Sequence, residues 1–196
     1  MGPRLVPPHV RYFDSWQESL AEWEGAHQDG ASVWLAEELG LDLTKPEDFD
    51  AWVETLLIEA DPSYPVPPGR VHATSLWIVE DGHYLGAVNL RHRLDEFLEN
   101  IAGHIGYGMR PSARRRGLAS FALDGALARA RTLGLDRVLI TCHVDNEGSR
   151  RTIERAGGVL TEIRQPDDFS RSFGFDYPMR RYEIDLTPGP LPAAEG

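Results

Sequence analysis

The stretch from residue 104 to residue 133 limits the possible fold more than any other part of this chain. Small and apolar residues alternate from 104 to 110, which predicts a strand. Pro111 ends that strand, because proline cannot donate to a β-ladder. Apolar residues then recur at helical spacing, which predicts a helix from Arg115 to about Leu133. The sequence therefore predicts a strand, a short turn and a long helix at the centre of the fold.

The predicted helix begins with arginines and a glycine. The first N–H groups of a helix have no acceptor within it, and the positive end of the helix dipole attracts anions. Gly117 has no Cβ, so a phosphate could approach the main chain closely. We therefore predict a pyrophosphate cradle, and an ordinary solvated helix start is the alternative. Its residues are Arg114, Arg115, Arg116, Gly117, Leu118 and Ala119, with the side chains of Arg114 and Arg116 as additional phosphate donors.

The cradle contains the pattern Arg-x-x-Gly-x-Ala between residues 114 and 119. This pattern resembles the acyl-CoA motif of the GNAT acetyltransferase superfamily. A second similar element follows at 138–149, where a strand runs into Asn146 and Ser149 at the start of the next helix. Together the two elements cover roughly residues 76 to 162. The resemblance implies that the cofactor is acetyl-CoA, which becomes coenzyme A after transfer.

The resemblance also implies an α/β fold in which a mixed, mostly antiparallel sheet is flanked by helices. The strand bearing His104 and the strand bearing Thr141 should be parallel neighbours that splay apart and hold the pantetheine arm between them. The order of the predicted elements agrees with this fold. Helices are predicted at 15–30, 32–39, 44–57, 115–133 and 146–156. Strands are predicted at 71–80, 83–91, 104–110, 137–143, 159–164 and 180–186.

Length and composition place this arrangement in one domain. A chain of 196 residues with 41% hydrophobic residues can bury a single core, which we expect at 13–186. We expect a flexible N-terminal segment at 1–12 and a disordered, proline-rich tail at 187–196. Two irregular segments, 61–69 and 165–176, are expected as loops that determine acceptor specificity.

Charge and residue types limit the partners. The formal net charge of −11 argues against nucleic acid, because duplex binding depends on neutralised phosphates. No apolar run is long enough to span a membrane, and Cys142 is the only cysteine, so we expect a cytoplasmic protein. The seven histidines lack the spacing of metal ligands, so no metal is expected. Both a monomer and a homodimer remain open.

Acyl transfer to an amine needs contacts to the donor, a proton acceptor and a proton donor. The backbone N–H groups of Tyr107 and Met109 could contact the acyl carbonyl and the pantetheine. Asn146 could hold a pantetheine amide, cap the helix, or do both. His104 is the predicted general base because imidazole titrates near neutral pH, and a structural histidine is the alternative. Ser149 lies one turn after the asparagine, where its hydroxyl could face the cofactor sulfur.

The resemblance places a candidate proton donor, a tyrosine, seven positions after the asparagine, but this chain has Ile153 there. Water could protonate the leaving thiolate instead. Polar side chains near the second predicted strand of the sheet and on the opposite rim could line the acceptor pocket. These are Glu59, Asn89, His92 and Glu99.

The sequence thus predicts an N-acetyltransferase that moves an acetyl group from acetyl-CoA to a primary amine by direct attack in a ternary complex. The acceptor could be a small molecule or a peptide. The alternative is a non-catalytic acyl-CoA-binding or sensing module, which would keep the cradle and, with Ile153, lack the proton donor.

Overall fold

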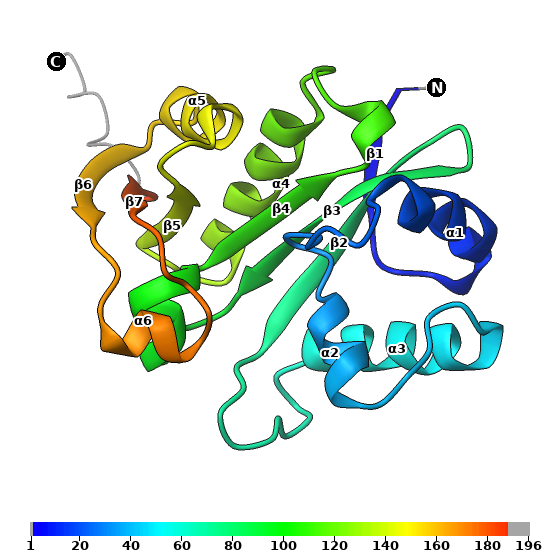
Figure 1. Cartoon of the computed structure of the whole chain (residues 1–196). Helices are drawn as coiled ribbons and strands as arrows, with labels where there is room; N and C mark the ends of the chain where they lie inside the picture. The colour runs from blue at the N-terminus through cyan, green and yellow to red at the C-terminus, as the bar shows by residue number, and fades with distance from the viewer. Residues whose placement is uncertain (1, 188–196) are drawn as a thin grey trace, which may run out of the picture.

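Two antiparallel sheets form the centre of the molecule (Figure 1). The computed structural model describes residues 2–187, so the predicted tail lies outside the described residues except for Thr187. The first sheet has the order β1-β2-β3-β4, with β1 (Arg4–Val6), β2 (Ala73–Glu80), β3 (His83–Arg91) and β4 (Ile105–Met109). The second sheet has the order β5-β7-β6, with β5 (Arg137–His143), β6 (Val159–Arg164) and β7 (Met179–Asp185).

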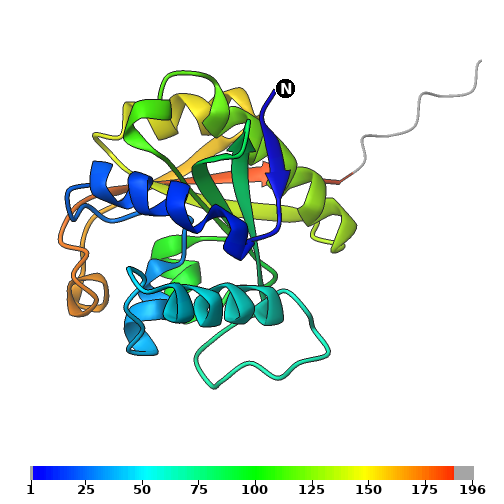
Figure 2. The ribbon, with the colours of Figure 1, turned by 90° about the vertical axis from the view of Figure 1, so that its right-hand side faces the viewer.

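Helices lie on both sides of the first sheet (Figures 1 and 2). They are α1 (Phe13–Glu22), α2 (Val33–Glu38), α3 (Pro46–Glu59), α4 (Leu118–Thr132), α5 (Glu147–Arg155) and α6 (Asp168–Ser172), with short helical turns η1 (Val10–Tyr12), η2 (Leu98–Ala102) and η3 (Pro111–Ala113). Successive strand residues point to opposite faces. Trp77 of β2 therefore packs in the core under α1 and α3, whereas its neighbour Ile78 packs in the core under α4. The predicted α/β class, with antiparallel strands flanked by helices, is confirmed.

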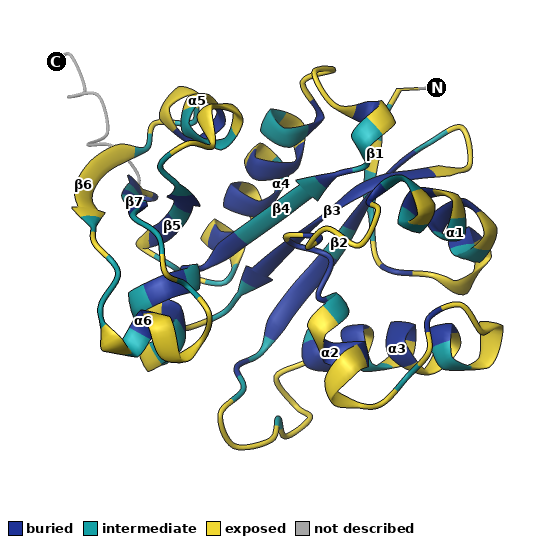
Figure 3. Ribbon diagram, viewed as in Figure 1, coloured by how far each residue is buried: buried dark blue, intermediate teal, exposed yellow. Residues whose placement is uncertain are grey.

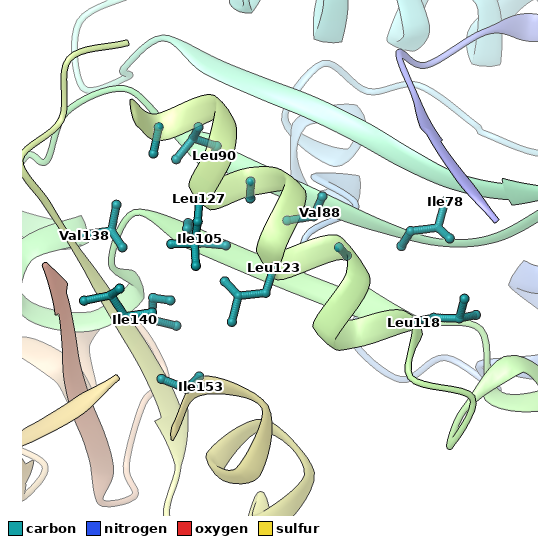
Figure 4. Packing of buried hydrophobic residues seen from close by; sticks show 14 of the residues in the cluster. Ile78, Val88, Leu90, Ile105, Leu118, Leu123, Leu127, Val138, Ile140 and Ile153 are labelled. Carbon is teal, nitrogen blue, oxygen red and sulfur yellow. The ribbon is translucent and has the colours of Figure 1, made fainter. Parts of the chain in front are cut away.

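α4 joins the two sheets through one hydrophobic core (Figure 4). Its Leu123 and Leu127 are buried together with Ile105 of β4 and with Val138 and Ile140 of β5. Full burial of one such side chain contributes about 1.5–3 kcal/mol. Because β4 and β5 share no ladder, this common packing rather than strand pairing holds the two sheets together.

Within the described residues, the backbone hydrogen bonding between the two sheets lies just before the start of β4 and at the middle of β5. Gly103 forms an isolated antiparallel bridge with Ile140, and the His104 N–H donates to the Leu139 carbonyl over 2.7 Å. A Cβ on Gly103 would stand 2.5 Å from that carbonyl oxygen, so only glycine permits this approach. The predicted separation of the two strands is present, and no parallel ladder joins them within the described residues. We call the space between the separated strands the opening.

Residues 4–12, expected to be flexible, instead form part of the fold. Leu5 pairs with Ile78 along the free edge of β2, and Tyr12 is only 4% exposed. The Leu5 side chain lies against Gly125 of α4, where a Cβ would collide with it. The strand satisfies backbone groups that would otherwise leave the edge of β2 open. β1 was not predicted, because its three residues lie between two prolines and are too few to show the apolar–polar alternation of a strand.

The other predicted elements are present: β3, β5 and β6 have the predicted boundaries, and the remaining strands and helices have shifted ones. α1 ends at Glu22, earlier than expected, and Glu24 then turns the chain with a positive φ of 48°. The segment 165–176, expected to be an irregular loop, contains α6, which begins with a capping box between Asp167 and Ser170. The two hydrogen bonds of this capping box satisfy the N–H groups of Asp167 and Ser170, which have no acceptor within the short helix.

An aromatic core lies between the first sheet and helices α1 and α3. Figure 3 shows that much of β2, β3 and α3 is buried. Its rings lie with centroids 5.3–5.9 Å apart, and each residue is at most 1% exposed. These residues are Trp16, Phe49, Trp52 and Trp77. Trp34 differs, because it is 42% exposed.

Candidate active site

α4 begins with an open N-terminus beside the opening. Gly117 is the N-cap, with a φ of 78°, and no side chain caps the helix. No heavy atom of the described chain lies within 4 Å of the position that a Gly117 Cβ would take. The Phe121 N–H donates to the Gly117 carbonyl, so the N–H groups of the three residues between them have no acceptor within the helix. Free donors, a positive dipole end and open space suit an anion.

The three arginines of the cradle differ in their contacts. Arg116 forms an ion pair with Glu80, so its guanidinium is turned to β2 and the predicted phosphate contact is already occupied. The Arg114 Nε donates to the Met109 carbonyl over 3.2 Å, and its guanidinium lies 5.0 Å from the Trp23 ring centroid. Arg115 is exposed and has a positive φ of 63°. Arg114 and Arg115 therefore remain as side-chain donors for an anion at this helix start.

The edge of β4 that borders the opening carries free backbone groups. The Arg91 N–H donates to the His104 carbonyl, and the Arg110 N–H donates to the Leu85 carbonyl. Even-numbered residues of β4 therefore point their backbone groups toward β3. Backbone groups alternate in direction along a strand. The N–H groups of Tyr107 and Met109 therefore point away from β3 and into the opening, as the predicted cofactor contacts require.

The first turn of α5 forms the opposite border. The Asn146 side-chain oxygen accepts from the Ser149 N–H over 3.0 Å, so the predicted helix cap is present and the amide N–H₂ stays available. The Tyr107 hydroxyl reaches across and donates to the Ser149 carbonyl over 3.4 Å. Burial raises the pKa of Tyr107 to about 12, so the phenol stays protonated at neutral pH. Ile153, fully buried, packs into the core under α4 and cannot donate a proton.

The structure argues against His104 as a general base. Its Nδ1 accepts from the Leu139 N–H over 3.0 Å, and the residue is 8% exposed at the junction of the two sheets. Burial, with a smaller effect of Arg91, lowers the pKa of His104 to about 4. A neutral ring that completes a backbone hydrogen bond is a structural element, which was the alternative interpretation of this residue.

We expect His104→Asn to reduce the pH dependence of the free energy of unfolding between pH 6.5 and about pH 4. The pKa of His104 is about 4 in the folded protein, and histidine in an unfolded chain titrates near 6.5. The stabilising effect of the neutral ring is complete above pH 6.5 and is lost as pH falls from 6.5 to about 4, because only the unfolded state takes up the proton there. The asparagine oxygen can still accept from Leu139 but does not titrate. Urea unfolding at several pH values measures the slope, and equal slopes in both proteins would contradict the assignment.

The four predicted acceptor residues do not gather around the opening. Glu59 is 7% exposed and pairs with Arg70 over 3.3 Å, and burial raises its pKa. Asn89 is buried and donates to the Ser75 hydroxyl. The two remaining side chains also have protein partners. These are His92, hydrogen-bonded to Thr74, and Glu99, which lies 3.9 Å from Arg181.

Sequence reasoning missed the connection between α1 and α2. A Cβ on Gly30 would stand 2.5 Å from the Gly106 carbonyl oxygen, and a Cβ on Gly108 would collide with the Asp29 carbonyl. Glycines on both sides thus let this connection lie directly on the face of β4 opposite α4. The signal in the sequence was the pair Gly106 and Gly108, whose missing side chains leave room for another backbone.

The fold and the site together define an α/β domain with an anion-binding helix start beside two separated strands. The acetyltransferase (GNAT) domain family matches residues 20–159. Because this match covers more than half of the chain, the chain belongs to the GNAT acetyltransferase family. No curated protein sequence matches it at a significant level.

Solved structures show the same fold. The chain is similar to YncA from Salmonella typhimurium with its cofactor acetyl-CoA, at 14% identity over 99% of each chain and a TM-score of 0.62. It is also similar to the microcin C7 self-immunity acetyltransferase MccE in complex with acetyl-CoA and AMP, at 18% identity over 93% of this chain and 92% of that chain, with a TM-score of 0.64. RimL, a ribosomal L7/L12 alpha-N-protein acetyltransferase in complex with coenzyme A, matches at 17% identity over 93% of each chain, with a TM-score of 0.64.

Within residues 2–187, no helix has both the length and the apolar character of a membrane span. The same residues contain no group of three or more His, Cys, Asp and Glu side chains that could hold a metal ion.

Proposed function

We propose that this protein transfers an acetyl group from acetyl-CoA to a primary amine by direct attack in a ternary complex. The observation that carries the proposal is the uncapped N-terminus of α4 at Gly117, which lies at one end of the opening between β4 and β5. Family membership and the bound acetyl-CoA or coenzyme A in the similar structures support the same donor.

The free donors of the site match the parts of acetyl-CoA in their order along the opening. The pyrophosphate would accept from the first N–H groups of α4 and from Arg114 and Arg115. The pantetheine would lie in the opening, with the N–H groups of Tyr107 and Met109 on one side. The free amide N–H₂ of Asn146 would donate to it from the other side.

Acetyl-CoA supplies a thioester whose carbonyl carbon an amine can attack, so that a C–N bond forms and the C–S bond breaks. The protein has to hold the amine near that carbon and stabilise the departing sulfur. Ser149 stands in the first turn of α5, next to the Tyr107 hydroxyl, and its own hydroxyl can donate to a thiolate. This donor compensates for the aliphatic Ile153.

The experiment is an assay of thiol release with acetyl-CoA and a panel of primary amines. For Ser149→Ala we expect kcat to fall about 10- to 100-fold, the effect of one hydrogen bond to a charged group, while the Kd for acetyl-CoA stays within about twofold. Thr55→Ala removes an exposed hydroxyl on α3 and serves as the matched control. Binding of acetyl-CoA without thiol release from any amine would instead support the acyl-CoA-sensing alternative.

A further inference from the structure

Two segments that are distant in the sequence flank the opening on the face opposite α4. The connection between α1 and α2 lies over β4, and the segment between β6 and β7 lies beside the end of β5. Figures 1 and 2 both place these two segments on the same side of the sheets, away from α4. The proposed donor occupies the opening between them, so an amine has to approach between the two segments.

The first segment contributes a carboxylate. Asp29 is held against β4 by the close approach of its backbone to Gly108, and its Oδ1 lies 3.4 Å from His27 Nε2. Surrounding protein raises the pKa of Asp29, although 68% of the side chain remains accessible to solvent. Its charge is close enough to raise the pKa values of both Tyr107 and Tyr177, in addition to the larger effect of burial. The carboxylate therefore lies within electrostatic range of both sides of the opening.

The second segment contributes four rings to a row of aromatic rings that ends at the opening. Neighbouring ring centroids are 4.6–6.1 Å apart. In order of contact the row is Phe169, Phe173, Phe97, Phe175, Tyr177 and His143. The last member is the final residue of β5, so the row leads from α6 to the border of the opening. Phe173 at the α6 end of the row is 51% exposed, and Phe175 and Tyr177, nearer the opening, are half-buried.

The charges around the two segments are unequally neutralised. The arginines of the second segment already have acidic partners, as in Arg164 with Asp167 and Arg171 with Asp176, both at 2.8 Å. Asp29 has only His27 as an ion-pair partner within the described chain. Arg91 acts on Asp29 from a greater distance, and burial lowers the pKa of this arginine to about 10. A carboxylate whose one ion-pair partner is an exposed histidine, beside aromatic rings, suits a cation with an apolar body.

We infer that the acceptor is a primary amine with an aromatic group next to its ammonium, in which Asp29 binds the ammonium and the row ending at Tyr177 binds the ring. This inference rests on the proposed function, because it names the acceptor of the same site. Stacking of a ring on an aromatic side chain contributes about 0.5–1.5 kcal/mol in addition to the free energy of burying its apolar surface. The stacking and the burial both favour an aromatic amine over a linear one. The same chemistry occurs in a free arylalkylamine and in a peptide that begins with phenylalanine.

The test compares acceptors in matched pairs by thiol release from acetyl-CoA. The free amines are 2-phenylethylamine and butylamine, and the peptides are Phe-Gly-Gly and Gly-Gly-Gly. We expect kcat/KM to be at least about tenfold higher for the aromatic member of the preferred pair. The pair with the higher kcat/KM identifies the source of the amine. Equal values within both pairs would overturn the inference and leave the proposed function intact.

Variants assign the preference to the two residues. Asp29→Asn should raise KM about tenfold for all amines with a smaller change in kcat, whereas Glu24→Gln, an exposed acid in the same connection, should not. Tyr177→Leu should remove the aromatic preference, and Tyr177→Phe should keep it. A preference that survives Tyr177→Leu would also overturn the inference.

A binding measurement separates this inference from the proposed function. NMR titration of 2-phenylethylamine into the wild-type protein saturated with coenzyme A does not depend on turnover. If no amine released thiol, the proposed function would fail on its own. Binding that Asp29→Asn abolishes would then still support the acceptor site, and absence of binding would contradict it.

Discussion

Replacing Gly117 with glutamate should weaken acetyl-CoA binding by at least about 100-fold, or about 2.8 kcal/mol. The backbone at Gly117 has a φ of 78°, and the space beside it is empty of protein atoms in the described chain. A glutamate would fill that space and place a negative charge at the helix end that we expect to hold a pyrophosphate. The effect combines a steric block, like-charge repulsion and loss of hydrogen bonds from the first turn of α4.

Gly134→Glu is the matched control for this change. Gly134 lies just beyond the other end of α4, has a φ of 77° and also has no heavy atom within 4 Å of its Cβ position. Both variants should lose about 1–2 kcal/mol of stability from the left-handed backbone. Calorimetric titration of acetyl-CoA should find the loss of affinity only in Gly117→Glu. Equal affinities in the two variants would place the cofactor elsewhere.

The largest loss of stability should follow Trp52→Ala, at about 3–5 kcal/mol. Trp52 is fully buried, and its ring lies 5.5 Å from both Trp16 and Phe49 and 5.9 Å from Trp77. Its Nε1 donates to the Ser32 carbonyl over 3.3 Å. The alanine would leave a cavity between three rigid rings, so the site could collapse only in part.

Trp34→Ala tests whether the expected loss of stability in Trp52→Ala depends on burial rather than on the residue type. Trp34 is 42% exposed, and the Arg70 guanidinium lies 5.7 Å from its ring centroid. Loss of an exposed cation–π contact costs about 0.5–1 kcal/mol. Urea unfolding of both variants gives the two free energies. A similar loss in both would contradict the aromatic core between the first sheet, α1 and α3.

The cradle and the strands around it could be predicted because their signals are local. A strand followed by proline and a glycine-containing helix start can be recognised within a short window, and α4 and β5 lie close to their predicted positions. The predicted direction of the Tyr107 and Met109 N–H groups also follows from local alternation once β3 is known to be the neighbour.

The errors in the candidate site arise from contacts between distant segments. His104 has the right chemistry for a base, but its ring accepts from Leu139, and no local pattern shows that pairing. Arg116 belongs to the predicted cradle, but its side chain pairs with Glu80. Asp29 showed no signal, because its position depends on glycines of β4 that lie far along the chain.

The sequence by itself determined the strands and helices other than β1 and α6, the family resemblance and the helix start that can bind an anion, because backbone propensity and capping act over a few residues. Only the tertiary structure decided which side chains remain free at the site. Burial and pairing engage His104, Arg116 and Glu59 within the protein, whereas Asp29 and Ser149 stay available beside the opening. A side chain can act on a ligand only if the fold leaves it without a stronger partner, and that depends on residues far away in the chain.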